Sequence, residues 1–368
     1  MKYYIIAGER SGDLHAANLV KSLRQLDADL EIRGIGGDYM KESGVQILMH
    51  YKELAVMGFL EVLKSIFRLR KFLQKCQNDV AAFKPDVLIL VDFAGFNMRM
   101  AKFGKANNFR TFYYISPKIW AWNQKRALKI KKSVDKMFVI LPFEKDFYKR
   151  YDYPVDYVGN PLLDAINAFQ PNDHFSANNR LDDKKIIAVL PGSRQQEVAY
   201  ILEIMLSVIN DFPDYRFVVA GVDNLSQEAY KVLDEIDRVS LVYDQTYDLL
   251  TQAQAAIVTS GTATLETALL NVPQVVCYRT SNFTYRIAKH LIKVEYISLV
   301  NLIAGQEVVR ELIQHELNYE NLKNAVRAIL PGGPERQNVL SGYVKVHELL
   351  GNKKASQTTA RLMVDYLS

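Results

Sequence analysis

Lys2-Tyr3-Tyr4-Ile5-Ile6-Ala7 runs directly into Gly8-Glu9-Arg10-Ser11-Gly12-Asp13 near the start of the chain. The first stretch is mostly apolar and predicts a buried strand. After the loop, apolar side chains recur at helical spacing in Leu14, Ala17, Leu23 and Leu26. A strand, a glycine-containing loop and a helix in this order predict the first βα unit of an α/β fold.

The rest of the chain continues this alternation. In the first half, strand-like runs separated by helical patterns occur at residues 31–34, 87–92, 112–115 and 137–141. A second series occurs at residues 186–190, 217–221, 240–243, 255–259 and 274–278. Strands that alternate with helices pair in parallel and are covered by those helices. The sequence therefore predicts two α/β units, each with its own parallel sheet.

A polar stretch at residues 164–185, rich in Asn and Asp, separates the two series. We therefore expect an N-terminal domain at residues 1–163, a linker at 164–185 and a C-terminal domain at 186–337. Residues 338–368 have a helical pattern and can pack on either half.

The composition limits the class of protein. Of 368 residues, 49% are hydrophobic and 24% are charged, as in a globular chain with a sizeable core. Two cysteines and six scattered histidines predict neither a disulfide framework nor a bound metal. The first residues lack the apolar core of a signal peptide, and no uncharged run reaches the ~18 residues of a membrane span. We expect a cytoplasmic protein, soluble or attached to a membrane surface.

Basic residues gather in two places. Residues 54–75 interleave apolar side chains with Lys and Arg, and a run of cations at 125–136 follows Trp120 and Trp122. Such segments suit an anionic membrane or acyl chains, although a core helix with a solvated basic face is the alternative for residues 54–75. Nucleic acid is the competing partner, but no RNA-binding aromatic motif occurs and the net charge is only +5, so we expect no nucleic acid.

The loop after the first predicted strand carries Glu9 and Ser11 at the start of a helix, where backbone N–H groups favour an anion. It lacks the GxGxxG and GxxxxGK[ST] patterns, which disfavours dehydrogenases and P-loop ATPases. A tight glycine turn is the alternative.

Two loops of the second half have the composition of a nucleotide site. Gly192-Ser193-Arg194 follows the run at 186–190 and opens a helix, an arrangement that holds pyrophosphate. Ser260-Gly261-Thr262 follows the run at 255–259, and the later carboxylate of Glu266 can accept from ribose hydroxyls. Ordinary helix caps are the alternative for both loops.

Asp92 ends the buried run at 87–92, at the strand edge where α/β sheets bind ligands. It is our candidate general base, because a carboxylate there can take a proton from a bound substrate. Capping of the next helix is the alternative.

The order of several motifs resembles the lipid-A-disaccharide synthase family over nearly the whole chain. They are residues 8–13, Ser116-Pro117-Lys118-Ile119-Trp120-Ala121-Trp122, Leu141-Pro142-Phe143-Glu144, Leu190-Pro191-Gly192-Ser193-Arg194, Ser260-Gly261-Thr262, Asn301-Leu302-Ile303-Ala304 and Glu311-Leu312-Ile313-Gln314. The family often reads Asp-x-Pro-Asp-Phe-Asn at residues 92–97, where this chain has Ala94 and Gly95 in place of the proline and the second aspartate.

The resemblance implies an inverting glycosyltransferase of the GT-B fold, with two Rossmann-like domains facing a central cleft and with no metal or cofactor. It implies that 2,3-diacylglucosamine passes from UDP-2,3-diacylglucosamine to the 6-hydroxyl of 2,3-diacylglucosamine 1-phosphate (lipid X). The products are the β-1,6-linked lipid A disaccharide 1-phosphate and UDP, within lipopolysaccharide biosynthesis. The acyl chains imply peripheral attachment to the cytoplasmic face of the anionic inner membrane through residues 54–75. Whether the protein forms a homo-oligomer is left open by the sequence.

The resemblance also implies roles for the matching residues. Asp92 would deprotonate the acceptor hydroxyl, and Arg194, with Gly192 and Ser193, would stabilise the departing diphosphate. The residues expected to hold the UDP-sugar are Ser260, Gly261, Thr262, Glu266, Asn301 and Gln314. The residues expected on the acceptor side are Glu9, Ser11, Asn97 and Trp120.

Two rival functions remain open from the sequence. Another enzyme acting on UDP-sugars, such as a 2-epimerase or an N-acetylglucosaminyl transferase that acts on a different lipid, would share the nucleotide site. An epimerase with a soluble substrate would not need an apolar basic helix. A peripheral membrane protein that binds lipid or nucleotide without turnover would not need Asp92 as a base.

Overall fold

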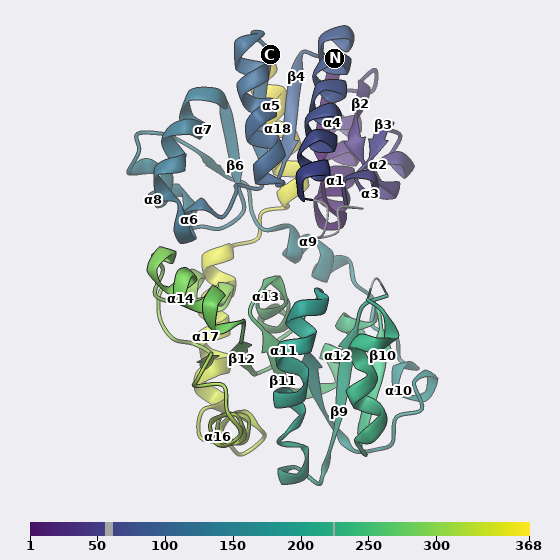
Figure 1. Ribbon diagram of the computed structural model, residues 1–368, viewed down its shortest axis with the longest axis vertical. Helices are drawn as coiled ribbons and strands as arrows, with labels where there is room; N and C mark the ends of the chain where they lie inside the picture. The colour runs from purple at the N-terminus through teal and green to yellow at the C-terminus, as the bar shows by residue number, and fades with distance from the viewer. Residues whose placement is uncertain (56–61, 224) are drawn as a thin grey trace. The chain divides into compact units, whose positions relative to one another are not determined.

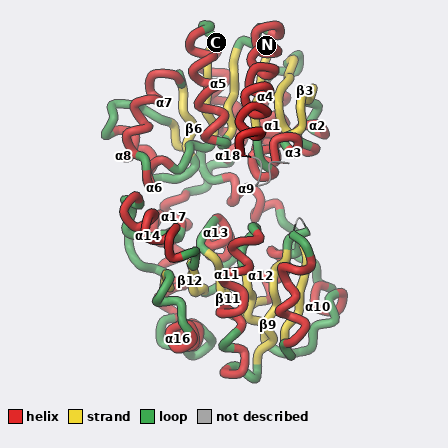
Figure 2. The backbone as a smooth tube through the Cα atoms, in the orientation of Figure 1, coloured by secondary structure: helices red, strands yellow, loops and turns green. Residues whose placement is uncertain are grey.

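The computed structural model describes residues 1–55, 62–223 and 225–368. The chain divides into two units: unit 1 contains Met1–Asp164 and Asn352–Ser368, and unit 2 contains Ala165–Gly351. Each unit has one parallel sheet packed with helices, as Figure 1 and Figure 2 show. This confirms the prediction of two α/β units.

The sheet of unit 1 has the order β3-β2-β1-β4-β5-β6-β7, and each of these neighbours pairs in parallel. Its strands are β1 (Lys2–Ala7), β2 (Glu31–Gly36), β3 (Gln46–His50), β4 (Val87–Val91), β5 (Arg110–Tyr114), β6 (Lys136–Val139) and β7 (Asp156–Tyr157). The chain builds outward from β1 to β3 and then crosses to β4 on the other side of β1. The topological switch point of this sheet therefore lies between β1 and β4. Sheets of this kind bind ligands at such a point, just outside the carboxyl ends of the strands.

Helices cover this sheet and include the last helix of the chain. They are α1 (Arg10–Leu26), α2 (Asp38–Glu42), α3 (Lys52–Ala55), α4 (Val62–Phe83), α5 (Ala94–Ala106), α6 (Ile119–Trp122), η2 (Gln124–Arg126), α7 (Ala127–Ser133), α8 (Glu144–Lys149) and α18 (Ala355–Leu367). Helix α18 packs against α1 and is the yellow helix among the purple and blue elements of Figure 1. Leu19 of α1 and Met363 of α18 lie in one buried cluster with Ile5 and Ile89 of the sheet. The apolar strand runs therefore form the core of unit 1.

The sheet of unit 2 has the order β10-β9-β8-β11-β12-β13 and is also parallel throughout its described pairs. Its strands are β8 (Lys185–Leu190), β9 (Tyr215–Gly221), β10 (Val239–Tyr243), β11 (Ala253–Thr259), β12 (Gln274–Tyr278) and β13 (Glu311–Ile313). The switch point of this sheet lies between β8 and β11.

The helices of unit 2 fill the connections between these strands. They are α10 (Phe175–Asn178), α11 (Gln195–Leu206), η3 (Ile209–Asp211), η4 (Gln227–Glu235), α12 (Thr246–Gln252), α13 (Thr262–Leu269), α14 (Asn282–Leu291), α15 (Leu299–Ala304), α16 (Tyr319–Ile329) and α17 (Arg336–Leu350). Helix α9 (Pro161–Ala168) crosses the boundary between the units.

The structure corrects the expected linker and the expected C-terminal segment. Phe175 of α10, within the supposed linker at 164–185, is fully buried in the core of unit 2. Residues 338–368 divide between the units, because α17 belongs to unit 2 and α18 returns to unit 1. Polar composition located the crossing point near Asp164 but could not reveal that the chain crosses twice.

The expected membrane-facing helix at residues 54–75 lies partly outside the described residues, since its side chains are described only from Leu69. Phe72 is 9% exposed and its ring meets that of Phe96 edge-on, with 5.7 Å between centroids. Phe72 is therefore a core residue, which agrees at this position with the alternative of a core helix and not with a lipid-facing side chain. The exposed cations of this part of α4 are Arg70, Lys71 and Lys75.

Candidate active site

In unit 1, two acidic residues follow the strands on either side of the switch point. Glu9 follows β1 and is the exposed N-cap residue of α1, and Asp92 follows β4 and is partly buried. The two strands pair in parallel, with Ala7 opposite Val91. Two carboxylates that are far apart in sequence therefore lie at the same edge of the sheet.

The backbone at Asp92 has an unusual conformation. Asp92 and Phe93 both lie in the left-handed region, with φ of 46° and 48°, which is uncommon for residues other than glycine. The Tyr113 hydroxyl donates to the Asp92 carbonyl. Asn97 Nδ2 donates to the carbonyls of Asp92 and Val91 at 2.8 and 3.1 Å. Asn97 is fully buried, and its Nδ2 holds this turn in place; contact of Asn97 with the acceptor stays a prediction.

The surroundings of Asp92 raise the pKa of its carboxyl above the usual value of an aspartate. Burial raises the pKa of the Asp92 carboxyl, the charge of Glu9 raises it further, and the Lys118 ammonium lowers it. A carboxylate whose pKa lies above its usual range is a stronger base than an exposed aspartate. The site therefore has the electrostatic character of a general base.

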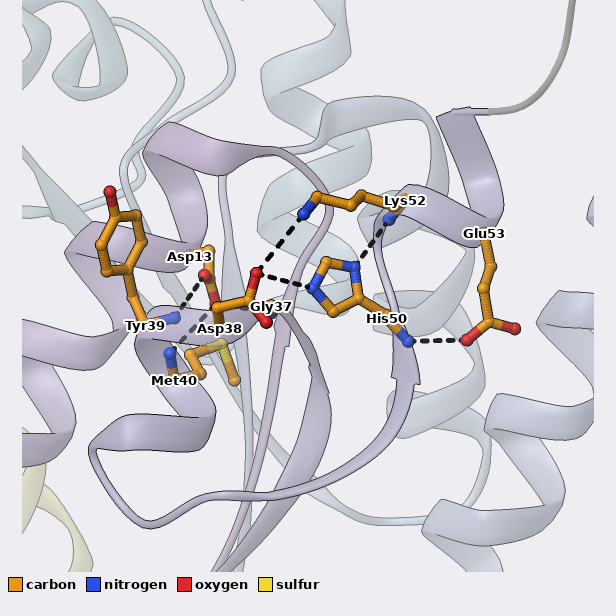
Figure 3. A network of polar contacts seen from close by, with 8 residues as sticks. All are labelled: Asp13, Gly37, Asp38, Tyr39, Met40, His50, Lys52 and Glu53. Atoms are coloured by element: carbon orange, nitrogen blue, oxygen red, sulfur yellow. Dashed lines mark hydrogen bonds and ion pairs between the residues drawn. The ribbon is translucent and has the colours of Figure 1, made fainter. Parts of the chain in front are cut away.

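The other residues of the loop at 8–13 have separate roles. Ser11 is exposed in the first turn of α1, whereas Asp13 is fully buried. Asp13 Oδ1 accepts from the N–H groups of Gly37 and Met40 at 2.6 and 3.3 Å, and Oδ2 accepts from Tyr39 at 3.1 Å (Figure 3). These donors lie at the start of α2, where helix N–H groups lack partners within the helix. Asp13 thus joins α1 to α2.

The two tryptophans differ in exposure, and the sequence prediction singled out the buried one. Trp120 is 6% exposed and its ring meets Phe143 edge-on, at 5.0 Å between centroids. Trp122 is 46% exposed, and the Arg126 guanidinium lies 5.4 Å from its ring centroid. Trp120 therefore packs between two loops, and Trp122 is the indole at the surface.

In unit 2, the loop at 191–194 lies at the carboxyl end of β8, beside the switch point. Gly192 has a φ of 107°, a conformation that other residues rarely adopt. Ser193 and Arg194 are exposed, and Arg194 is the N-cap residue of α11. The first N–H groups of a helix and a guanidinium beside them together favour an anion.

The second loop of this edge follows β11, which pairs in parallel with β8. Ser260 Oγ donates to the Ile297 carbonyl at 2.9 Å, so its hydroxyl is used inside the protein. Gly261 is the N-cap residue of α13 and Thr262 is exposed at its first position. The structure thus brings residues 192–194 and 260–262 to one edge, as expected for a nucleotide site.

Glu266 lies one turn further along α13. It accepts from the Tyr247 hydroxyl at 2.7 Å, and burial raises the pKa of its carboxyl. A carboxylate in this setting is a hydrogen-bond acceptor held in a fixed place, which suits recognition of a hydroxyl group.

Two amide side chains expected to contact the ligand are buried and engaged. Asn301 Oδ1 accepts from the N–H groups of Val308 and Val309 at 2.8 and 2.9 Å, and its Nδ2 donates to the Val309 carbonyl. Gln314 exchanges hydrogen bonds with the backbone of Thr280, at 3.2 and 2.9 Å. Both side chains therefore hold loops of unit 2, and sequence alone could not separate this role from ligand contact.

Three residues near these sites were not predicted: Lys118, Tyr113 and Tyr247. Lys118 lies in a motif quoted above and follows β5, next to β4, so its place at the same edge was a usable signal. The two tyrosines lack such a signal, because the partner of a buried hydroxyl depends on packing.

Within the described residues, no helix combines the length and the apolar character that a membrane span requires. In the same part of the chain, no three His, Cys, Asp or Glu side chains are grouped as metal ligands.

The surface of unit 1 carries a cluster of cations. The basic run after Trp122 is largely exposed, at Lys125, Lys129, Lys131 and Lys132.

The sequence comparisons match nearly the whole chain to one family. A family model described as lipid-A-disaccharide synthetase matches residues 3–363. The lipid-A-disaccharide synthase of Geobacter sulfurreducens is 35% identical over 371 residues, which cover 99% of this chain and 96% of the relative. That of Myxococcus xanthus is 38% identical over 373 residues, covering 99% and 97%.

Solved structures share the fold at low sequence identity. The UDP-GlcNAc 2-epimerase of Neisseria meningitidis, solved with UDP-GlcNAc, has a TM-score of 0.69 at 14% identity and covers 99% of this chain and 100% of its own. The calicheamicin glycosyltransferase CalG4 has a TM-score of 0.63 at 13% identity, covering 100% and 97%. These likenesses confirm the predicted GT-B fold.

Proposed function

This chain belongs to the lipid-A-disaccharide synthetase family and is a glycosyltransferase of lipid A biosynthesis, and we propose how its residues divide the reaction. The donor is UDP-2,3-diacylglucosamine and the acceptor is 2,3-diacylglucosamine 1-phosphate. The acceptor 6-hydroxyl attacks the anomeric carbon of the donor with inversion. The products are the β-1,6-linked disaccharide 1-phosphate and UDP.

This division of roles among the residues rests on one observation: in each sheet, the candidate loops lie at the switch point of that sheet. In unit 1 that position holds Glu9 and Asp92, and in unit 2 it holds the loops at 192–194 and 260–262. The carboxylates of unit 1 suit a hydroxyl acceptor, and the helix N-termini of unit 2 suit a diphosphate.

Asp92 is the general base of the proposed reaction. As the oxygen–carbon bond forms, the Asp92 carboxylate takes the proton from the acceptor 6-hydroxyl, because an alcohol is a poor nucleophile while it keeps that proton. The raised pKa of Asp92 strengthens it as a base, and the turn braced by Asn97 and Tyr113 holds its position.

The loops of unit 2 stabilise the leaving group. When the bond between the anomeric carbon and the diphosphate breaks, the electron pair stays on UDP and its negative charge grows. Arg194 and the N-terminus of α11, reached through Gly192 and Ser193, supply the opposing positive charge without a metal ion. Gly261, Thr262 and Glu266 hold the nucleotide, while Ser260, Asn301 and Gln314 keep the surrounding loops in place.

The acyl chains of both substrates place the reaction at a membrane surface. We propose that the protein attaches peripherally to the cytoplasmic face of the anionic inner membrane. The exposed cations Lys71 and Lys75 of α4, and those after Trp122, support this attachment because basic residues near anionic lipids each contribute about 1 kcal/mol.

The test is a thin-layer assay of the purified protein with UDP-2,3-diacylglucosamine and 2,3-diacylglucosamine 1-phosphate, with and without EDTA. We expect a disaccharide product whose yield EDTA leaves unchanged. Loss of product in EDTA would overturn the metal-free scheme alone. Folded protein that binds UDP but forms no disaccharide would overturn the assigned reaction, and assays for epimerase and other transferase activities on UDP-sugars would follow.

A further inference from the structure

We propose that Glu311 is a positioning residue for the nucleotide site: its buried carboxylate fixes the peptide group to which Ser260 anchors the loop after β11. The inference rests on the proposed function, in which this loop holds the nucleotide of the donor. Glu311 touches neither the donor nor the reacting atoms in this scheme. It acts on the donor through a chain of hydrogen bonds inside unit 2.

The carboxylate of Glu311 accepts three hydrogen bonds from one segment of the chain. Glu311 begins β13, at the edge of the sheet, and is 9% exposed. Its Oε2 accepts from the N–H group of Ile297 at 2.9 Å, and its Oε1 accepts from that of Ser298, also at 2.9 Å. Asn301 Nδ2 donates to Oε1 at 2.9 Å. Both carboxylate oxygens are therefore engaged, and together they fix the start of α15.

The peptide group between Ile297 and Ser298 is held from both sides. Its N–H, on Ser298, donates to Glu311, and its carbonyl, on Ile297, accepts from Ser260 Oγ at 2.9 Å. Because a trans peptide group is planar, with its N–H and C=O pointing in opposite directions, the carboxylate sets the direction of the carbonyl. The carboxylate also polarises the peptide group, which makes the carbonyl a stronger acceptor for the hydroxyl.

Ser260 anchors the loop that opens α13. Its N–H donates to the Cys277 carbonyl at 3.0 Å, so both its backbone and its side chain are held. The next residue, Gly261, has little packing around it, since a Cβ there would meet only the Thr259 carbonyl oxygen, at 4.0 Å, among the described residues. Hydrogen bonds therefore hold this loop: Thr264 Oγ1 donates to the Gly261 carbonyl at 2.8 Å on one side, and Ser260 links it to the carboxylate on the other.

A carboxylate suits position 311 better than an amide does, because every group that bonds it is a donor. Asn301 cannot turn its oxygen toward position 311, since that oxygen already accepts from the N–H groups of residues 308–309. A glutamine has one acceptor oxygen and one N–H₂ group. Its N–H₂ would face the N–H of either Ile297 or Ser298, which leaves a buried donor without an acceptor and displaces the segment.

The experiment measures two properties of the full chain: its affinity for UDP, by calorimetry, and hydrogen–deuterium exchange in peptides that cover the loop at 259–263, by mass spectrometry. The variants are Glu311→Gln, Ser260→Ala and the double variant. Glu311→Asp is the milder change, because it keeps the charge and shortens the side chain by one methylene group.

Asp182→Asn is the matched control. Asp182 is also a carboxylate of unit 2 that accepts hydrogen bonds, from Arg216 Nε and Nη2 at 2.9 Å each. It lies at the amino edge of the same sheet, before β8, so its loss should leave UDP affinity and loop exchange at the wild-type values.

We expect Glu311→Gln and Ser260→Ala each to weaken UDP binding by about three- to tenfold, the effect of losing one hydrogen bond, and to speed exchange in the loop. Glu311→Asp should change both in the same direction to a smaller extent. The double variant should bind UDP about as well as the weaker single variant, because each change breaks the same chain of bonds. In turnover, Glu311→Gln should raise the KM for the donor and leave that for the acceptor unchanged, a split that a general loss of stability does not produce.

Wild-type UDP affinity in the folded Glu311→Gln variant, or in Glu311→Asp if the glutamine variant does not fold, would overturn the proposal. So would a double variant whose loss of affinity is the product of the two single losses, because Glu311 and Ser260 would then act separately. Wild-type protein that forms no disaccharide would overturn the proposed function, while UDP affinity and loop exchange still decide the role of Glu311.

Discussion

The ring of Phe93 lies against Gly8: a Cβ at position 8 would come within 2.3 Å of two of its ring atoms. Gly8 follows β1 and Phe93 follows Asp92, so this contact joins the loops on the two sides of the switch point of unit 1. The close approach needs a residue without a side chain, and it keeps the loop of Glu9 next to the turn of Asp92.

Gly8→Ala should therefore disturb the base more than a surface change would. The added methyl must push the Phe93 ring away, which costs about 1–3 kcal/mol of unfolding free energy and shifts the adjoining Asp92. A displacement of about 1 Å at a reacting group lowers the rate by up to ~100-fold. Urea unfolding and kcat measure the two effects.

Gly95→Ala is the control for this variant, because nothing lies within 4 Å of a Cβ at that position of α5. Alanine there should raise the unfolding free energy by up to about 1 kcal/mol, through its better helix propensity. If Gly8→Ala keeps wild-type stability and kcat, the contact with Phe93 does not position the base.

Asp92→Asn should keep UDP affinity and lower kcat by about 10²- to 10⁴-fold, because the amide cannot take the proton of the acceptor hydroxyl. Calorimetry with UDP and the disaccharide assay measure these quantities. Turnover equal to that of the wild type would remove Asp92 as the base.

Glu9→Gln tests the electrostatic part of the same site. The charge of Glu9 raises the pKa of Asp92, and the reaction needs the ionised form of that carboxyl. Removing the charge lowers the pKa, so the acidic limb of log kcat/KM against pH should move to lower pH. A limb that moves to higher pH, or stays in place, would contradict the interaction between these two carboxylates.

Arg194→Ala should weaken UDP binding by about 10- to 100-fold, the effect of losing one hydrogen bond to a charged group. Arg194→Lys keeps the charge, so its affinity for UDP should lie between that of the wild type and that of Arg194→Ala. The fold of unit 2 should persist in both, since Arg194 is exposed. Unchanged affinity and unchanged kcat in Arg194→Ala would exclude its role at the diphosphate.

The sequence was sufficient for the central strands of both sheets and for the loops that follow them at the switch points. The central strands are continuous apolar runs because both faces of a parallel sheet are buried, and glycine and hydroxyl residues directly after such runs indicate ligand loops. Strands β3, β7 and β13 were not predicted; each lies at the edge of its sheet and is short or only partly buried, so it lacks a continuous apolar run. The return of α18 to unit 1 depends on packing between residues hundreds of positions apart, which periodicity does not contain.

Polar residues near the sites were harder to interpret. Asn301, Gln314 and Asn97 look alike in a sequence whether an amide binds a ligand or a backbone, and here all three are engaged by the protein itself. Trp120 and Trp122 lie two positions apart, and only the geometry after β5 decides which indole is buried.

The described part of α4 allows the core and membrane roles of this helix to be separated. Phe72→Ser should lower the unfolding free energy by about 3 kcal/mol or more, because it removes a buried ring. Changing Arg70, Lys71 and Lys75 together to Glu should leave stability nearly unchanged and reduce binding to anionic vesicles, measured by sedimentation. Vesicle binding that survives this triple change would place the membrane contact elsewhere.

Glu144 should make stability depend on pH in a way that a glutamine removes. Burial raises the pKa of this carboxyl from the ordinary value of 4.5 to about 7, so the folded protein keeps a proton that the unfolded chain has already lost between these pH values. Stability from this group is therefore highest at low pH and falls as pH rises toward 7. The difference in unfolding free energy between Glu144→Gln and wild type should shift in favour of the variant by an amount on the order of 3 kcal/mol between pH 4 and pH 8. Urea unfolding at both pH values measures the shift, and a constant difference would show that Glu144 does not titrate in this range.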